Sequence, residues 1–237
     1  MDKYEKMEEF KDLLGQARAD GDREAEASAL YGIGEIYLKE SILDAAEDFF
    51  SQCARVCRES GQNEELAQVL IDLGNMAVEA KAFDKSEKLY LEAMEICKEL
   101  TSPQVRARLL DRIGDLALAR EDWDRALEVS LEGLKLCQGP GDNVGAIFFL
   151  EKIIPIYKAK GLADDVEASY RALVTAADKI GDRDRMALGL VGLADVYERT
   201  GKSREAIPHL EMAHDLYLRL GKENEAGLIR EQVENLR

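Results

Sequence analysis

The chain has 237 residues, of which 46% are hydrophobic and 34% charged, and its 48 acidic and 32 basic side chains give a net charge of −16. This acidity disfavours binding to nucleic-acid backbones and to anionic membranes, and it favours basic partners. No stretch approaches the ~18 apolar residues of a membrane-spanning helix, and the start MDKYEKMEEF lacks a signal-peptide pattern, so we expect a cytoplasmic protein.

A 40-residue repeat runs along the chain and is marked by leucines at one equivalent position: Leu30, Leu70, Leu110, Leu150 and Leu190. A fixed period of this length predicts stacked helical hairpins, each of which buries its apolar face only against its neighbours. The small number of prolines and the absence of β-hairpin signals also favour helices over sheet.

The elements follow this period in chain order. Residues 2–20 are expected to form one helix that matches the second helix of a hairpin, because Phe10 stands 40 residues before Phe50. Residues 221–237 are expected to form a closing helix that matches a first helix. Five full repeats lie between them: 21–60, 61–100, 101–140, 141–180 and 181–220. The expectation is an all-α solenoid of about twelve helices in one domain spanning 1–237.

Small residues recur at one position in four of the five repeats, and turn signals recur at fixed places. A small residue inside the first helix indicates close helix–helix approach: Gly34, Gly74, Gly114 and Ala194. Turns within the hairpins are expected near 41–43, 81–83, 121–123, 161–163 and 201–203. Glycines in the left-handed region are expected after the second helices: Gly61, Gly141, Gly181 and Gly221. At the corresponding place in the third repeat, Ser102 is expected to cap the next helix.

Two irregularities fall near the middle of the chain. Pro155 lies deep inside a predicted first helix, where a proline removes one backbone hydrogen bond and predicts a kink. The segment Gly139-Pro140-Gly141 is predicted to be the weakest joint between repeats. Together they predict a hinge or a widened groove, with a tolerated irregularity as the alternative.

The repeated patterns L-x₂-[LI]-G-x₂-[YA] and A-x₃-[FY]-x₂-A resemble the tetratricopeptide repeat, in its long 40-residue form found in Leu-Gly-Asn-repeat G-protein regulators, kinesin light chains and bacterial peptide-pheromone receptors. The resemblance implies a right-handed superhelix of antiparallel helix pairs whose first helices line a concave groove. Recurring glycines disfavour the alternative of a HEAT- or armadillo-type solenoid. The chain departs from the pattern at Ser130, Gly133, Ile154 and Pro155.

The same resemblance implies a set of partner-binding residues on the first helices: Tyr31, Glu35, Ile71, Asn75, Arg108, Asp111, Arg112, Asp115, Phe148, Glu151, Val191 and Asp195. The wider face also includes Ser28, Gln68 and Leu188. Four apolar members are expected to be exposed among carboxylates, which favours a partner with basic and apolar character: Tyr31, Ile71, Phe148 and Val191. The alternative is that sandwiched helices are apolar on more than one face.

By resemblance, Asn75 is expected to hydrogen-bond the backbone of an extended peptide. Arg108 and Arg112 stand where a related subset holds a terminal carboxylate, but other positions of that clamp carry the wrong residues: Tyr31, Glu35 and Asp72. Recognition of a chaperone tail is therefore disfavoured. The alternating charges of Arg108, Asp111, Arg112 and Asp115 are also compatible with simple ion pairing along a helix.

The sequence gives little support for catalysis or for metal and cofactor binding. The four cysteines are expected to be small packing residues: Cys53, Cys57, Cys97 and Cys137. His209 and His214 lie far from the close pair Cys53 and Cys57, so neither a metal nor a cofactor is expected. No nucleophile–base arrangement and no phosphate-binding loop is present, and the chain is not expected to be an enzyme.

The predicted function is therefore a non-catalytic protein–protein interaction scaffold, expected to be a monomer, that binds a peptide or helix of a partner in its groove. One alternative is a scaffold that self-assembles by end-to-end stacking of its terminal half-repeats. Another is a peptide-sensing regulatory module. The regular register also leaves open whether the chain is natural, excised or engineered.

Overall fold

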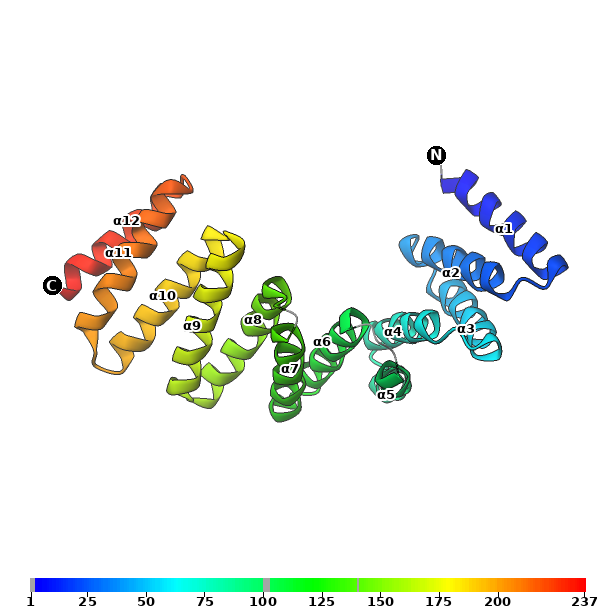
Figure 1. The fold of residues 1–237 in the computed structure, drawn as a ribbon, viewed down its shortest axis with the longest axis horizontal. Coiled ribbons are helices and arrows are strands. Elements are labelled where there is room, and N and C mark those ends of the chain that lie inside the picture. Colours follow the sequence, from blue (N-terminus) through cyan, green and yellow to red (C-terminus); the bar gives the residue numbers. More distant parts are fainter. Residues whose placement is uncertain (1–2, 100–102, 140) are drawn as a thin grey trace. The chain divides into compact units, whose positions relative to one another are not determined.

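Twelve α-helices and no strands make up the described part of the computed structural model, which covers residues 3–99, 103–139 and 141–237 (Figure 1). Their bounds are α1 Lys3–Asp20, α2 Arg23–Lys39, α3 Leu43–Ser60, α4 Asn63–Glu79, α5 Phe83–Glu99, α6 Pro103–Ala119, α7 Trp123–Gln138, α8 Asn143–Lys160, α9 Ala163–Ile180, α10 Arg183–Arg199, α11 Ser203–Arg219 and α12 Glu223–Leu236. The predicted all-α class is confirmed, and the helices coincide with the predicted elements.

The chain divides into two compact units, Met1–Asp122 with α1 to α6 and Trp123–Arg237 with α7 to α12. The division falls between α6 and α7, inside the predicted repeat 101–140, and not at the joint that the sequence indicated near Gly139. A single continuous solenoid domain stays a prediction. Pro140 of that joint and the predicted cap Ser102 lie outside the described residues.

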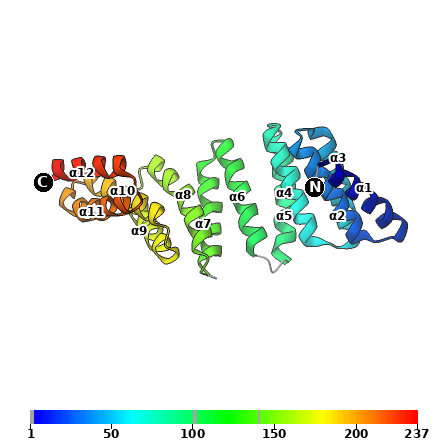
Figure 2. The same ribbon diagram turned by 90° about the horizontal axis from the view of Figure 1, so that it is seen from above.

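Consecutive helices pack as hairpins in both units (Figures 1 and 2). In the first unit α2 packs on α3 and α4 on α5, while in the second α8 packs on α9 and α10 on α11. Asp22 begins α2 as its N-cap, because its side chain accepts hydrogen bonds from the backbone N–H groups of Glu24 and Ala25 at 3.1 and 3.0 Å.

The turns confirm the predicted glycines and add a position that the sequence did not reveal. Gly61 ends α3 with φ of 72°, and the other predicted closing glycines also have positive φ. Within the hairpins, Ser41, Lys81 and Glu121 have φ of 59°, 57° and 60° at the place where later repeats have glycine. A residue with a side chain is strained there, so the early hairpins hold these turns against a local preference.

Glycines inside the first helices make room for aromatic rings of the second helices. A Cβ built on Gly34 would lie 2.7 Å from the ring of Phe50, and one built on Gly74 would lie 2.3 Å from the ring of Tyr90. Phe50 and Tyr90 are 0% and 1% exposed. The predicted close approach at Gly34 and Gly74 is therefore confirmed, because any side chain there would displace a buried ring.

One departure from the pattern is compensated in the next hairpin. Ile154 is buried at the position of these glycines, and the ring of Tyr170 packs instead on Gly192 of α10, at 2.2 Å from a Cβ built there. Phe10 of α1 packs in the same way on Gly32 of α2. The aromatic ring of a second helix thus finds a glycine in its own hairpin or in the following one.

A second departure is also explained by packing between hairpins. The space beside Gly133 of α7 is filled by the ring of Phe149 of α8, which would lie 2.2 Å from a Cβ added to Gly133. One repeat later the glycine is on α10 instead, and the space beside Gly189 is occupied by Val174 and Leu173 of α9. In both repeats a side chain of the neighbouring helix fills the space beside the glycine, as close packing of an interior requires.

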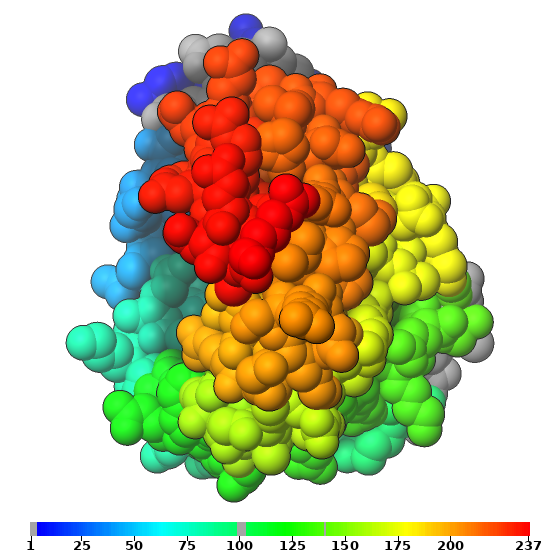
Figure 3. Space-filling model, turned by 90° about the vertical axis from the view of Figure 1, so that its left-hand side faces the viewer, coloured from blue at the N-terminus to red at the C-terminus, as the bar shows by residue number. Residues whose placement is uncertain are grey.

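At the C-terminal end of the second unit α12 covers α11, as Figure 3 shows from that side. Ile229 and Val233 of α12 join Leu210, Leu193 and Tyr197 in one buried cluster. Val233 therefore packs as the repeat register predicts for the last first-type helix.

Pro155 is exposed and α8 continues through it as one helix, so the expected kink stays a prediction.

Ion pairs join successive repeats on the surface. Arg58 of α3 contacts Glu92 of α5 at 2.8 Å, and Arg185 of α10 contacts Glu151 of α8 at 2.8 Å. Each pair is partly exposed, so it contributes about 1 kcal/mol or less. The stability of the units therefore comes from the buried side chains, and these pairs mainly favour one register of stacking.

All four cysteines are buried and free, which confirms their assignment as packing residues. Across the described residues, no helix is both long and apolar enough to cross a membrane.

His209 gives the second unit an expected sensitivity to acid. Burial lowers the pKa of its imidazole, and the nearby Arg171 lowers this pKa further while Glu167 partly opposes the change. Its ring stacks on Tyr197 with centroids 5.5 Å apart. Because the unfolded chain then binds the proton more readily, His209 contributes stability above its ordinary pKa of about 6.5, and this contribution is lost as pH falls below that value.

We therefore expect the melting temperature to fall more between about pH 7.5 and about pH 5 in the wild type than in His209→Gln, which cannot titrate in this range. Circular dichroism at 222 nm measures both proteins at each pH. Equal pH dependence of the two proteins would contradict the assignment, since other groups titrate identically in both.

Candidate functional site

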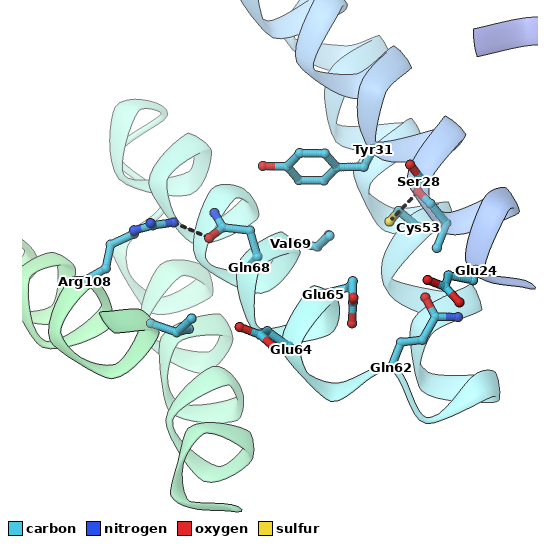
Figure 4. Close-up of a pocket in the computed structure, with 12 residues that line it drawn as sticks. Glu24, Ser28, Tyr31, Cys53, Gln62, Glu64, Glu65, Gln68, Val69 and Arg108 are labelled. Carbon is cyan, nitrogen blue, oxygen red and sulfur yellow. Dashed lines mark hydrogen bonds between the residues drawn. The ribbon is translucent and has the colours of Figure 1, made fainter. Parts of the chain in front are cut away.

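A pocket of about 480 Å³ opens on the first unit, between helices of successive repeats (Figure 4). Helices α2, α4 and α6 supply most of its wall, and α3 contributes one residue. Its lining consists of Glu24, Ala27, Ser28, Tyr31, Cys53, Gln62, Glu64, Glu65, Gln68, Val69, Val105 and Arg108. A volume of this size is typical of ligand pockets, which measure about 300–1,000 Å³.

One wall is held by a chain of hydrogen bonds across three repeats. Tyr31 donates its hydroxyl proton to Asp72 at 2.8 Å, and the Gln68 amide donates to the same carboxylate at 3.0 Å. Arg108 in turn donates to the Gln68 oxygen. Burial raises the pKa of Asp72, and burial together with the Asp72 charge raises the pKa of Tyr31. The wall is therefore preorganised, with Arg108 at its outer end.

The apolar part of the pocket is formed by buried side chains. Ala27, Val69 and Val105 are 2%, 1% and 8% exposed and lie behind the opening. Cys53 donates its thiol proton to the Ala27 carbonyl at 3.3 Å and lies 4.0 Å from the sulfur of Cys57. The contact with the Cys57 sulfur and burial raise the pKa of Cys53, so its thiol acts as a packing group and not as a nucleophile.

Three exposed glutamates form the acidic rim of the pocket, namely Glu24 of α2 and Glu64 and Glu65 of α4. Figure 4 shows Glu24 and Glu65 on the side of Gln62, with Glu64 closer to α6. Within the described part of the chain, none of the three makes an ion pair or a side-chain hydrogen bond. The rim is therefore an uncompensated negative region beside apolar side chains.

Two of the predicted binding residues of the first unit line this pocket, Tyr31 and Arg108. Ile71 was expected to be exposed, and this is wrong, because its side chain is 0% exposed. Its repeat position faces inward in α4, since sandwiched repeat helices are apolar on more than one side. Glu35 lies outside the lining and forms a weak ion pair with Lys39 at 3.9 Å.

Asn75 is already engaged within its own hairpin. Its side-chain oxygen accepts a hydrogen bond from the Tyr90 hydroxyl at 2.7 Å. The amide N–H₂ and the second lone pair of the oxygen remain available, so the expected contact with a peptide backbone stays a prediction. Asn75 acts first as the partner that satisfies a buried tyrosine.

Part of the charged cluster on α6 is paired along its helix, as the alternative predicted, whereas Arg108 donates to Gln68 of α4. Arg112 lies 3.6 Å from Asp111 and 3.4 Å from Asp115. Asp111 is only 6% exposed. The predicted binding role of these three residues is untouched by this geometry and stays a prediction.

In the second unit the predicted residues are mostly exposed or paired. Phe148 is 42% exposed, and the Lys152 ammonium lies 4.9 Å from the centre of its ring. Val191 is half-buried. Glu151 pairs with Arg185, and Asp195 is bound by Arg199 at 2.8 Å and by Lys158 at 3.5 Å.

Sequence reasoning missed the acidic rim and found only part of the face on which it lies. Ser28 and Gln68 were placed on the wider binding face, and both line the pocket. Glu24 and Glu64 occupy one repeat position, one helical turn before Ser28 and Gln68. That periodicity was the available signal, whereas the lack of counter-ions becomes visible only in the structure.

Stacked helical hairpins define a helical-repeat protein, and its first unit has a pocket lined mainly by first helices. Residues 25–99 and 65–139 match the sequence model of the tetratricopeptide repeat. The chain is therefore a tetratricopeptide-repeat protein across residues 25–139. A further match is the glycerol operon regulatory protein of Streptomyces coelicolor, with 36% identity over 63 residues, and the match covers 27% of this chain and about a quarter of that protein, 25%.

Solved structures share the fold at low sequence identity. BtubC (BKLC) from P. vanneervenii is 14% identical with a TM-score of 0.70, and 93% of each chain is covered. A Rap protein complexed with competence and sporulation factor is 13% identical with a TM-score of 0.61, covering 97% of this chain and 69% of that one. A putative kinesin light chain with TPR-like repeats from P. anserina is 11% identical with a TM-score of 0.61, covering 82% of this chain and 96% of that one. These similarities confirm the α-solenoid fold.

Proposed function

We propose that this chain is a non-catalytic protein–protein interaction scaffold that binds a segment of a partner protein on the exposed face of its first helices. One repeat position carries the proposal. Ser28, Gln68 and Arg108 at this position line the pocket of the first unit. Phe148 and Leu188, at the same position in the second unit, are 42% and 50% exposed.

Exposed large apolar side chains at one recurring position support binding, because soluble proteins keep few such groups in register unless a partner covers them. The neighbouring carboxylates Glu151 and Asp195 are already paired with basic side chains. The second unit therefore offers a neutralised surface with apolar side chains, and the first unit offers an acidic one.

Leu188→Asp tests this function. We expect it to weaken binding of a partner segment by at least about tenfold, because a charge placed at the centre of a contact removes apolar burial and adds desolvation. Peptides selected by display against the full chain serve as ligands, and fluorescence anisotropy measures their affinity.

Leu218→Asp is the matched control, since Leu218 is also a leucine with 50% exposure in the same unit but lies on the second helix α11. Affinity that changes less than about twofold in this control supports binding by the first helices. The reverse result, loss with Leu218→Asp and none with Leu188→Asp, would assign binding to the outer helices.

A peptide-sensing regulatory module is the second candidate. The Rap structure, whose overall fold is shared here, is of a complex with competence and sporulation factor. This candidate differs from a passive scaffold in requiring a conformational response to the ligand. The cytoplasmic location, the monomeric state and the alternative of end-to-end assembly stay predictions, and light scattering over a concentration series distinguishes the last two.

A further inference from the structure

The pocket of the first unit combines a shape and a charge that indicate what enters it. Its inner surface is apolar through Ala27, Val69 and Val105, and its rim carries three glutamates. A long side chain with an apolar stem and a cationic end matches this order, because its methylene groups contact the apolar wall while its charge stays at the wet rim.

Several basic side chains of the first unit are bound to partners other than the rim glutamates. Arg18 and Arg23 both bind Glu26, at 2.9 and 2.7 Å, and Arg23 also approaches Glu59 at 3.8 Å. Arg108, at the opposite end of the pocket, donates to Gln68. Within the described residues, Glu24, Glu64 and Glu65 are thus left without an internal counter-ion, and a cation of a partner would supply one.

The charge of the whole unit favours the same ligand. Residues 1–122 carry 28 acidic and 16 basic side chains, whereas residues 123–237 carry 20 and 16. Most of the excess negative charge therefore belongs to the unit that contains the pocket. A field of this sign raises the local concentration of cationic segments and their association rate.

We propose that this pocket receives the side chain of a lysine or arginine from the bound partner segment, with the cationic end between Glu24, Glu64 and Glu65 and the stem on Ala27, Val69 and Val105. The proposal rests on the proposed function and names the chemistry that one part of the surface selects. Ser28, exposed at the mouth, offers a hydroxyl to the backbone of the segment. The fixed wall of Tyr31, Asp72 and Gln68 limits how far the side chain enters.

The experiment titrates the full chain with four acetylated tripeptide amides, Ala-X-Ala, in which X is lysine, arginine, norleucine or glutamate. Amide chemical shifts in ¹H–¹⁵N spectra report on residues 24–31 and 62–69. We expect saturable shifts there with the lysine and arginine probes and none with the glutamate probe. A higher salt concentration should weaken binding of the lysine and arginine probes, because the rim is exposed to solvent.

The double variant Glu64→Gln/Glu65→Gln removes two rim charges at nearly unchanged size. We expect the lysine probe to bind about five- to tenfold more weakly, as loss of two exposed charge contacts predicts. Glu9→Gln/Asp12→Asn on α1 removes the same net charge away from the pocket, where both residues are exposed, and is expected to bind within about twofold of the wild type. Circular dichroism confirms that both variants are folded.

Three results would overturn the proposal. Equal binding of the norleucine probe would show that the pocket selects apolar shape alone. Equal weakening in both double variants would reduce the effect to net charge. Absence of saturable shifts in the pocket, together with loss of partner binding in Leu188→Asp, would remove the cation site while the scaffold function stands.

Discussion

Leu110→Ala is expected to lower the free energy of unfolding by about 2–5 kcal/mol, as large-to-small substitutions of buried leucines do. Leu110 is 1% exposed in α6, at the repeat position that marks the 40-residue period. Truncation removes apolar contacts and leaves a cavity between helices that cannot close without moving the stack. Urea unfolding of the full chain, followed by circular dichroism, measures the loss as a lower transition midpoint.

Leu91→Ala in α5 is the control, because Leu91 is 50% exposed in the same unit. Its midpoint is expected to change by the equivalent of about 0.5 kcal/mol or less. If both variants lost the same stability, the buried repeat leucines would not be the source of cohesion. In that case the surface ion pairs between repeats would need a larger role than their exposure allows.

Gly74→Ala is expected to destabilise the first unit by about 1–3 kcal/mol, although alanine is normally the better helix residue. The added Cβ would lie 2.3 Å from the Tyr90 ring, which is 1% exposed. The ring has little freedom to move, since its hydroxyl is bonded to Asn75. The same urea titration measures the effect.

Gly15→Ala in α1 separates helix propensity from steric clash, because no atom lies within 4 Å of a Cβ added there. This variant is expected to stabilise the chain by about 0.5–1 kcal/mol, the ordinary gain of replacing a helical glycine. Combining Gly74→Ala with Tyr90→Leu should recover part of the loss. A Gly74→Ala variant as stable as the wild type would contradict close contact between α4 and α5.

The helices could be predicted because their signals are local and periodic. Spacing of apolar residues places a helix, and a closing glycine such as Gly61 ends one, without knowledge of any distant residue. The turn position of Ser41, Lys81 and Glu121 escaped prediction, because these residues seldom have positive φ and only the surrounding hairpin holds them there.

The candidate site was only partly predictable. Tyr31 and Arg108 were found from the face on which they lie, and Ile71 was misplaced because one helix can bury residues on two sides. Glu24, Glu64 and Glu65 looked like ordinary surface charges in the sequence. Their lack of counter-ions depends on where Arg18, Arg23 and Arg108 point, which spacing along the chain does not encode.

The sequence by itself determined the period of 40 residues, the helical class, the excess of acidic side chains and the glycines that follow the second helices. All of these follow from single positions or from spacing along one helix. Tertiary structure decided which residues share a volume, such as Gly133 with Phe149 and Gly192 with Tyr170. It also decided which carboxylates stay unpaired around the pocket. Packing and ion pairing join residues of different repeats, and their outcome depends on distances in space that a one-dimensional pattern does not contain.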